Sequence, residues 1–364
     1  MTAEPVETTF AVVGGGFRAE AFLRVAAALP GRFRVSEAVV RNAERAAELR
    51  ESWDVQTVPD LSGVTDASQV DFVVVAVRPT EAVDVITELT ASGHAVLTET
   101  PAAPDIAGLE SLVALVRAGA RIQVAEQYHL EPLLSSQLAL VRGGLIGDVS
   151  EAFVSVAHDY HGISVLRRML GVGFENAEIT ARRFTERLRE GPSRYSDPDE
   201  DRLVEGTRTT AWLDFEGGGH GTYDFDDQQY RSWIRSPSLL VRGSDGELRD
   251  ETVRHLDDFR TPVTDSLERI DAGGAGNHEG LFLRGYAFGR ARIYSNQFAP
   301  ARLADDELSI ATLLSRTGEW ARGGAEVYSV AEAAQDQYLQ LAVRRAAESA
   351  QPVTTRTQMW ASVG

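Results

Sequence analysis

The chain has 364 residues, 43% of them hydrophobic, which is typical of a globular protein of roughly two domains. It carries a formal net charge of −18, and all 36 basic residues are arginine because the chain contains no lysine. The acidic balance argues against a nucleic-acid partner, since phosphate binding needs a basic surface. Zero cysteines exclude disulfide bonds, iron–sulfur clusters and thiolate chemistry.

Membrane-directing segments are missing from the sequence. No stretch approaches the roughly 20 uncharged apolar residues of a membrane span. The N-terminus, Met1–Glu7, is acidic and lacks the apolar core of a signal peptide. We therefore expect a cytoplasmic protein without a membrane partner.

Apolar runs of strand length alternate with helical stripes through residues 1–126. Asn42 is placed to cap the second helix. Strands separated by helices of this length form a parallel sheet, so we expect an α/β protein whose residues 1–126 are a doubly wound Rossmann domain. The predicted strands are Thr9–Val13, Val35–Val40, Phe72–Val77, Ala95–Thr98 and Ile122–Ala125.

The pattern changes after residue 126. Thr207–Phe215 and His220–Phe225 flank a glycine-rich turn and predict a hairpin, and Ser244–Gly246 predicts the turn of a second hairpin. We therefore expect residues 127–364 to form a second α/β domain with an open, predominantly antiparallel sheet.

The sequence predicts one helix before the strands of that sheet and another after them. Pro132 is placed to begin a helix that ends at Gly143, and Val149–Ala157 follows as a long strand. The last helix starts at a capping box, Ser329–Glu332. Segments 191–202 and 271–280 are expected to be exposed loops.

A glycine-rich turn follows the first predicted strand. Gly14-x-Gly16-x-x-Ala19 comes after an apolar strand and opens a helix, which is the context of a dinucleotide-binding fingerprint. Gly14 permits a tight turn, and Gly16 lets a diphosphate approach the helix N-terminus. Phe17 and Arg18 are expected to contact the cofactor there. The alternative is a turn with a structural role only.

The end of the second strand bears on the choice between NAD and NADP. An acidic residue there would bind the ribose hydroxyls of NAD, but the strand ends in Arg41-Asn42, and Glu37 lies inside it. Arg41 could meet a 2′-phosphate, which favours NADP, or it could be a solvated residue of the next helix. Arg78-Pro79 follows the third strand, where the cofactor passes, although Pro79 could simply start a helix.

Several spaced segments resemble the glucose–fructose oxidoreductase / inositol dehydrogenase (Gfo/Idh/MocA) family over nearly the full length. Glu99-Thr100-Pro101 resembles the family's Glu-Lys-Pro, and Gln127-Tyr128-His129-Leu130-Glu131-Pro132 resembles its Asn-Tyr-Arg-x-x-Pro. Gly144–Gly147 matches the turn before the second sheet. His161–Gly171 resembles His-x-x-Asp-x-x-Arg-x-x-x-Gly.

The resemblance implies a Rossmann domain, a second domain with an open sheet, a sugar- or polyol-like substrate and a homo-oligomer. It also implies that Glu99 contacts the nicotinamide ribose and places Thr100 and Gln127 beside the cofactor. Thr100 replaces the lysine that positions the reacting hydroxyl in the family, and it cannot act as a charged acid. The family's two aspartates near the histidine match Ala157 and Ser164.

His161 is the acid–base residue that we predict. An imidazole with an ordinary pKa near 6.5 suits proton transfer at neutral pH. His158 and Tyr160 are predicted to assist it, with Tyr160 donating its phenol proton to a developing alkoxide; alternatively both only pack. Tyr128 and His129 follow the last Rossmann strand and are expected to line the substrate crevice. The seven histidines show no metal-ligand spacing, so no metal site is expected.

These observations lead to one hypothesis and two alternatives. The first is an NAD(P)-dependent oxidoreductase, leaning to NADP, that acts by hydride transfer on a sugar, inositol or related polyhydroxylated small molecule. The second is a lyase or glycosidase that uses bound NAD only transiently. The third is a non-catalytic dinucleotide-binding protein, because the lysine and both aspartates are gone.

Overall fold

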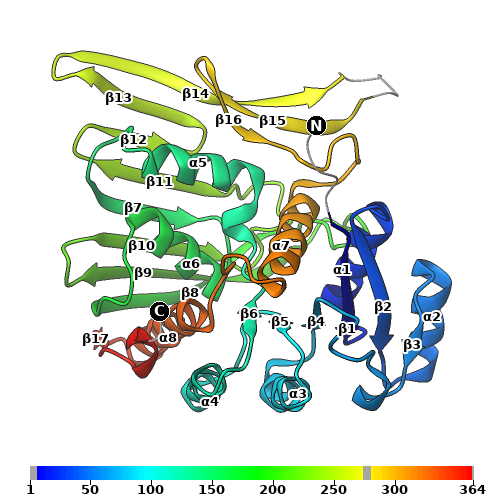
Figure 1. Ribbon diagram of the computed structural model, residues 1–364. Helices are drawn as coiled ribbons and strands as arrows, with labels where there is room; N and C mark the ends of the chain where they lie inside the picture. The colour runs from blue at the N-terminus through cyan, green and yellow to red at the C-terminus, as the bar shows by residue number, and fades with distance from the viewer. Residues whose placement is uncertain (1–5, 274–279, 363–364) are drawn as a thin grey trace.

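The computed structural model describes residues 6–273 and 280–362 and contains two sheets side by side (Figure 1). The first sheet has six parallel strands in the order β3-β2-β1-β4-β5-β6. The strands are β1 (Thr8–Val13), β2 (Phe33–Val39), β3 (Thr57–Val58), β4 (Phe72–Val75), β5 (Val96–Thr98) and β6 (Ile122–Val124).

Burial explains why these segments become central strands. Every residue of β1 and of β4 is buried, as the continuous apolar runs predict for strands covered on both faces. The strand order reverses between β1 and β4, where a crevice opens at the carboxyl ends. The predicted doubly wound Rossmann sheet is therefore confirmed.

Helices follow the strands of this sheet. They are α1 (Phe17–Ala28), α2 (Ala43–Trp53), α3 (Pro79–Ala91) and α4 (Ile106–Arg117), with short 3-10 turns η1 (Leu61–Gly63) and η2 (Tyr128–Leu130). The Asn42 side chain caps α2 by accepting a hydrogen bond from the Arg45 amide at 2.8 Å, as predicted. Pro79 occupies the first turn of α3.

The second sheet has eleven strands in the order β16-β15-β14-β13-β12-β11-β7-β10-β9-β8-β17. Only β7 and β10 pair in parallel among these described strands, so the predicted predominantly antiparallel sheet is confirmed. The strands are β7 (Val149–Ser155), β8 (Ala177–Arg189), β9 (Leu203–Phe215), β10 (His220–Asp226), β11 (Ser238–Gly243), β12 (Gly246–Arg249), β13 (Thr252–Asp258), β14 (Thr261–Ala272), β15 (Phe282–Phe288), β16 (Ala291–Ser295) and β17 (Val353–Thr354).

Both predicted hairpins are present, but two sequence expectations need correction. The loop expected at 271–280 is in part strand, because Asp271 and Ala272 pair with β15; residues 274–279 lie outside the described residues. The strand expected to reach Ala157 ends at Ser155. Helix α6 begins four residues later, so the chain turns toward it earlier than the apolar run indicates.

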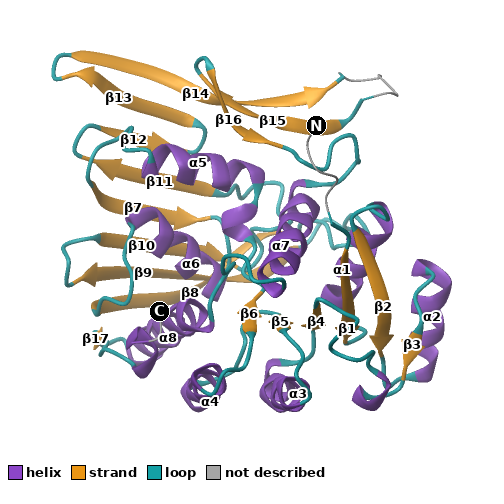
Figure 2. Ribbon diagram, viewed as in Figure 1, coloured by secondary structure: helices purple, strands orange, loops and turns teal. Residues whose placement is uncertain are grey.

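The remaining helices join the two sheets. They are α5 (Pro132–Arg142), α6 (Asp159–Leu170), α7 (Asp305–Ala321), α8 (Val330–Ser349) and the 3-10 turn η3 (Met359–Ser362). Helices α5, α6 and α8 lie along one face of the large sheet, and α7 lies beside α1 (Figure 2).

The C-terminal segments return to the N-terminal sheet. The Gln123 side-chain oxygen on β6 accepts hydrogen bonds from the amides of Val327 and Tyr328 at 2.8 and 2.7 Å. One core cluster contains Val73 of β4 together with Tyr328 and Trp360. The predicted boundary at residues 126/127 lies just after β6, but segments far beyond it complete the packing of the first sheet.

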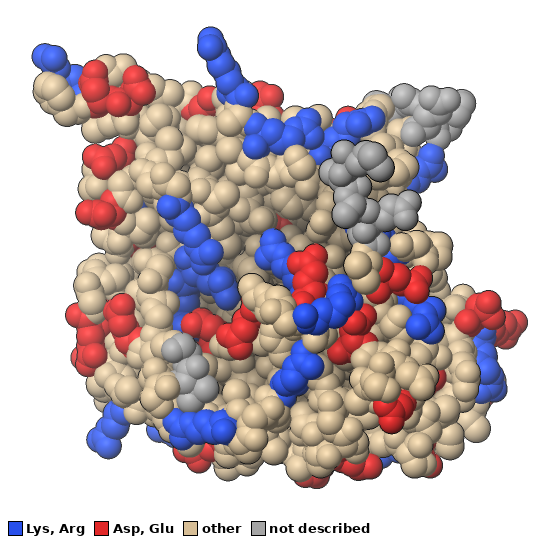
Figure 3. All heavy atoms as spheres, viewed as in Figure 1, with Lys and Arg blue, Asp and Glu red and all other residues tan. Residues whose placement is uncertain are grey.

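On the face shown in Figure 3, arginine side chains are interspersed with acidic ones. Within the described residues, no helix is both long and apolar enough to cross a membrane.

Removing the predicted cap of α8 tests how much this cap contributes to the stability of the folded protein. Ser329 accepts a hydrogen bond from the Glu332 amide at 3.2 Å. We expect Ser329→Ala to lower the free energy of unfolding by about 1 kcal/mol, since an N-cap hydrogen bond is lost. Urea unfolding measures it. Ser111→Ala, an exposed position inside α4, should cause no such loss, and equal effects of the two would contradict the capping role.

Candidate active site

The turn between β1 and α1 is built around its glycines. Gly14 has a φ of +130°, and a Cβ there would lie 2.3 Å from the Ala76 carbonyl oxygen, so only glycine fits. A Cβ on Gly16 would meet nothing within 4 Å. Gly14 is therefore required by packing, whereas Gly16 leaves open space before the N-terminus of α1, which is the place for an anion.

A cleft of about 810 Å³ opens at this turn. It brings together nine of the eleven predicted cofactor residues; Pro79 and Gln127 are not among its lining. The nine are Gly14, Gly16, Phe17, Arg18, Arg41, Asn42, Arg78, Glu99 and Thr100. The size, the glycine turn and the free helix N-terminus fit a dinucleotide.

Basic and acidic side chains both line the end of the cleft near β2. Arg41 is exposed and forms an ion pair with Glu81 at 2.7 Å. Glu37 does not reach the cleft, because its buried carboxylate accepts hydrogen bonds from the amide and hydroxyl of Thr65. Asp60, which the sequence reading did not single out, lines the cleft near η1.

Arg18 connects the glycine turn to the other end of the cleft. Its guanidinium donates to Glu99 Oε1 at 3.0 and 2.7 Å, and to the side-chain oxygen of Gln127. These three predicted residues come from α1, from the loop after β5 and from the loop after β6. Arg18 thereby fixes two segments that follow neighbouring strands.

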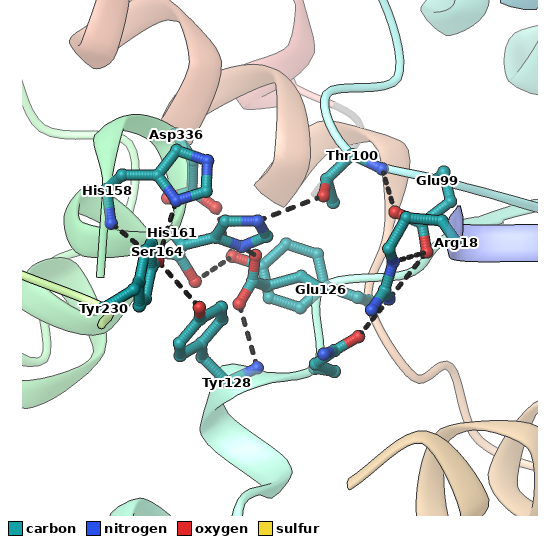
Figure 4. A network of polar contacts seen from close by, with 12 residues as sticks. Arg18, Glu99, Thr100, Glu126, Tyr128, His158, His161, Ser164, Tyr230 and Asp336 are labelled. Carbon is teal, nitrogen blue, oxygen red and sulfur yellow. Dashed lines mark hydrogen bonds and ion pairs between the residues drawn. The ribbon is translucent and has the colours of Figure 1, made fainter. Parts of the chain in front are cut away.

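His161 lies where these loops meet, and Figure 4 shows its partners. Its Nδ1 lies 2.6 Å from Glu126 Oε2, and its Nε2 lies 3.3 Å from the Thr100 hydroxyl oxygen. Glu126 also accepts a hydrogen bond from the Tyr128 amide at 3.1 Å. The Glu126 side chain is 0% exposed, so these partners take the place of water as its hydrogen-bond donors.

The Glu126 contact selects a state of the His161 ring. A carboxylate at Nδ1 favours the tautomer whose proton is on Nδ1, which leaves Nε2 as the acceptor beside Thr100. Nε2 therefore faces Thr100, which lines the dinucleotide cleft, whereas His161 itself is not among the residues that line it. The sequence analysis does not single out Glu126. A carboxylate directly after an apolar parallel strand could have marked it, because ligand crevices lie at the carboxyl ends of such strands.

His158 precedes α6 and takes part in a second chain of hydrogen bonds. Its Nδ1 lies 2.7 Å from the Tyr230 hydroxyl, which is 2.9 Å from the Tyr128 hydroxyl (Figure 4). Burial and the neighbouring His161 lower the pKa of His158, which favours the neutral ring. The rings of His158 and Tyr128 thus flank that of His161, with centroid distances of 5.2 and 4.7 Å, and the Tyr230 hydroxyl connects His158 with Tyr128.

Tyr160 does not lie as the predicted strand alternation requires. Because α6 begins at Asp159, Tyr160 is in its first turn, 3% exposed, and its hydroxyl has no hydrogen-bond partner among the described residues. It packs in the core cluster that contains Tyr328. This position gives no support to the predicted proton donation.

His129 also lies away from the dinucleotide cleft. Its ring is 5.5 Å from that of Tyr328, and its Nδ1 is buried without a partner among the described residues. Burial, together with Arg168, Arg316 and Arg142, holds its pKa well below the usual value. The predicted contact with substrate has no support in this placement, whereas Tyr128 faces His161 at 4.7 Å between ring centroids.

The family comparison bears on the first third of the chain. Residues 8–128 match the family described as "Oxidoreductase family, NAD-binding Rossmann fold". This confirms the resemblance predicted from the sequence. No curated protein matches the chain by sequence.

Solved structures resemble the chain over almost its whole length. An NAD binding oxidoreductase from Klebsiella pneumoniae is 16% identical, with a TM-score of 0.69, over 97% of this chain and 100% of that one. Levoglucosan dehydrogenase in complex with NADH and levoglucosan is 16% identical, with a TM-score of 0.68, over 96% and 99%. scyllo-Inositol dehydrogenase from Lactobacillus casei is 16% identical, with a TM-score of 0.65, over 96% and 99%. At these identities the likeness establishes the fold, including the second sheet.

The buried His129 predicts how stability depends on pH. The pKa of His129 is lowered in the folded state. Below about pH 6.5 the unfolded chain therefore binds a proton that the folded chain does not, and the free energy of unfolding decreases as the pH is lowered. Between about pH 7.5 and 5.5 this costs roughly 1 kcal/mol. His129→Asn should lose less stability over that range. Unfolding curves at the two pH values measure it, and parallel losses in both proteins would contradict the assignment.

Proposed function

We propose that the protein is an NAD(P)-dependent oxidoreductase that acts on a CH–OH group of a sugar, inositol or related polyhydroxylated small molecule. The observation that carries the proposal is His161, which is supported by the buried Glu126 and has Nε2 beside Thr100, a residue that lines the dinucleotide cleft. Two of the structures that it resembles are levoglucosan dehydrogenase and scyllo-inositol dehydrogenase, which supports this substrate class.

The cleft supplies the groups that a dinucleotide needs. The amides at the start of α1 and the open space at Gly16 would hold the diphosphate. Glu99, held by Arg18, would accept hydrogen bonds from the nicotinamide ribose. The chemistry that a nicotinamide dinucleotide supplies when bound is hydride transfer.

The side chains around His161 provide proton transfer. Nε2 accepts the proton of the substrate hydroxyl as the carbonyl forms, and returns it in the reverse direction. Glu126 keeps the ring in the required tautomer and stabilises the imidazolium, which is the role of a positioning residue. The Thr100 hydroxyl lies beside Nε2. Because Thr100 stands where the family has a lysine, His161 carries out the proton transfer in which that lysine assists.

Substitutions at His161 and Glu126 separate proton transfer from cofactor binding. We expect His161→Ala to lower kcat by about 100-fold or more, and Glu126→Gln by about tenfold or more, because a proton acceptor and its charged partner are lost. Absorbance at 340 nm over a polyol and sugar panel measures turnover, and nucleotide fluorescence measures NADH binding. The exposed Glu88→Gln is the matched control.

The Kd for NADH should remain unchanged in both variants. An undiminished kcat in His161→Ala rejects the assignment. A Glu126→Gln variant that loses NADH affinity and kcat together would give Glu126 a structural role only.

Arg41 supports NADP as the preferred cofactor. It lines the cleft beyond β2, and an arginine suits a 2′-phosphate, although Glu81 is paired with it and competes. We expect Arg41→Ala to weaken NADPH binding by about tenfold and to leave NADH binding nearly unchanged. Fluorescence titration with both nucleotides measures the difference. Equal losses for the two would mean that Arg41 does not read the 2′-phosphate.

The same assays distinguish the other two hypotheses. A cleaved glycoside without net NAD(P)H change would support transient oxidation followed by elimination. Cofactor binding without hydrogen isotope exchange between labelled nicotinamide and any substrate would support a non-catalytic protein. The buried Glu126–His161 pair favours catalysis over that third hypothesis, because burying a charge beside a histidine is costly without a use.

The predicted homo-oligomer is supported by the exposed face of the second sheet. Trp212 of β9 is 48% exposed between the buried Ala211 and Leu213, and Phe184 of the adjoining β8 is 43% exposed. Large exposed aromatic side chains on adjacent strands suit an interface.

A further inference from the structure

The loop between β8 and β9 reaches the glycine turn of the first sheet. The two strands pair antiparallel along their whole lengths, and residues 190–202 join their ends. In this loop Arg194 has its guanidinium carbon Cζ 3.5 Å from the centroid of the Phe17 ring. Phe17 is the first residue of α1 and lines the dinucleotide cleft, whereas Arg194 is not among the residues that line it. A cation from the second sheet thus lies on an aromatic side chain of the cleft.

The Arg194 guanidinium has no anionic partner in the described part of the chain. Its own loop contains five carboxylates, but those that form ion pairs do so with other arginines. Glu190 pairs with Arg202, and Asp201 pairs with Arg189. Contact with an aromatic ring uses the face of a guanidinium, whereas its N–H donors lie at the edge of the group. The stacked side chain therefore keeps its donors free for an anion.

Two arginines that line the cleft beside the glycine turn already have carboxylate partners. Arg18 pairs with Glu99 at 2.7 Å, and Arg45 pairs with Glu20 at 2.6 Å. Each positive charge is therefore partly offset before a diphosphate enters the cleft. Arg194 differs from both, because no carboxylate offsets its charge among the described residues.

The base of the loop contacts the segment that carries Tyr230. A Cβ on Gly191 would lie 2.9 Å from the Cα of Ser232, so the two backbones touch. The Tyr230 hydroxyl in turn contacts His158 and Tyr128, whose rings flank that of His161. One loop thus contacts both a side chain of the dinucleotide cleft and the segment next to the proposed proton acceptor.

We propose that Arg194 binds the diphosphate of the dinucleotide and thereby fastens the β8–β9 loop to the bound cofactor. Because the Phe17 ring belongs to the first residue of α1, a guanidinium on that ring lies within a side chain's length of the free amides at the start of this helix. The planar fork of an arginine matches two phosphate oxygens, and the α1 amides bind the others. This inference rests on the proposed function, since it requires a dinucleotide in the cleft.

Fluorescence titration of the full chain with NADH and with NADPH tests this role of Arg194. We expect Arg194→Gln to weaken the binding of both nucleotides by the same factor, about tenfold, because both carry the diphosphate and a charge-assisted hydrogen bond to it is lost. Arg194→Lys keeps the charge without the fork and should recover part of the affinity. The control is Arg183→Gln, which removes an exposed arginine of β8 and should bind both nucleotides as the unaltered chain does.

Three results would overturn the assignment of Arg194. They are unchanged NADH affinity in Arg194→Gln, a loss for NADPH alone, which would put the guanidinium at the 2′-phosphate, and an equal loss in Arg183→Gln, which would reflect overall charge. Thermal unfolding of each variant shows whether it is folded.

The turnover assay of His161→Ala separates this inference from the proposed function. If His161 is required for turnover while Arg194→Gln keeps its affinity for both nucleotides, only the assignment of Arg194 fails. If Arg194→Gln loses affinity for both nucleotides while His161→Ala keeps its kcat, only the proposed function fails.

Discussion

The buried contact between Glu126 and His161 is the interaction on which the candidate site depends. A carboxylate with no exposed surface must be paired or hydrogen-bonded, and Glu126 has both the imidazole and the Tyr128 amide. Glu126 follows the last parallel strand, whereas His161 lies in the first turn of α6. The contact therefore requires that the two sheets hold a fixed relative position.

Packing of the C-terminal segments provides that fixed position. The Gln123 side chain binds two consecutive amides ahead of α8, three residues before Glu126. Arg24 of α1 pairs with Glu307 of α7 at 2.6 Å. The elements that present His161 and those that form the dinucleotide cleft are thus held by side chains from the opposite half of the chain.

The sequence predicts the fold well where local rules decide. The apolar runs of β1 and β4, the cap at Asn42 and the box at Ser329 are read from spacing, because burial on both faces and capping leave a local pattern. Strands β8 and β14 escape such reading, since they are half exposed and rich in charged residues. The sequence predicts too late an end for β7, because an apolar run continues through Ala157 although the strand ends at Ser155.

The site shows the same division. The glycine turn and nine of the residues that line the cleft could be predicted, because a fingerprint and a family motif mark them. Glu126 could not be paired with His161 from spacing, since a strand end and a helix start 35 residues apart meet only through the tertiary fold. For the same reason the inward placement of Tyr160 and His129 depends on where α6 begins and on Tyr328, which precedes α8.

Threonine at position 100 has a chemical consequence beyond proton transfer. With no lysine in the chain, no side-chain amine is available to condense with a carbonyl compound. Arginine does not replace it in this respect, since a guanidinium stays protonated and is a poor nucleophile near neutral pH. In the reaction proposed above, an aldehyde or ketone product would therefore form no imine with a lysine side chain and would leave as the free carbonyl.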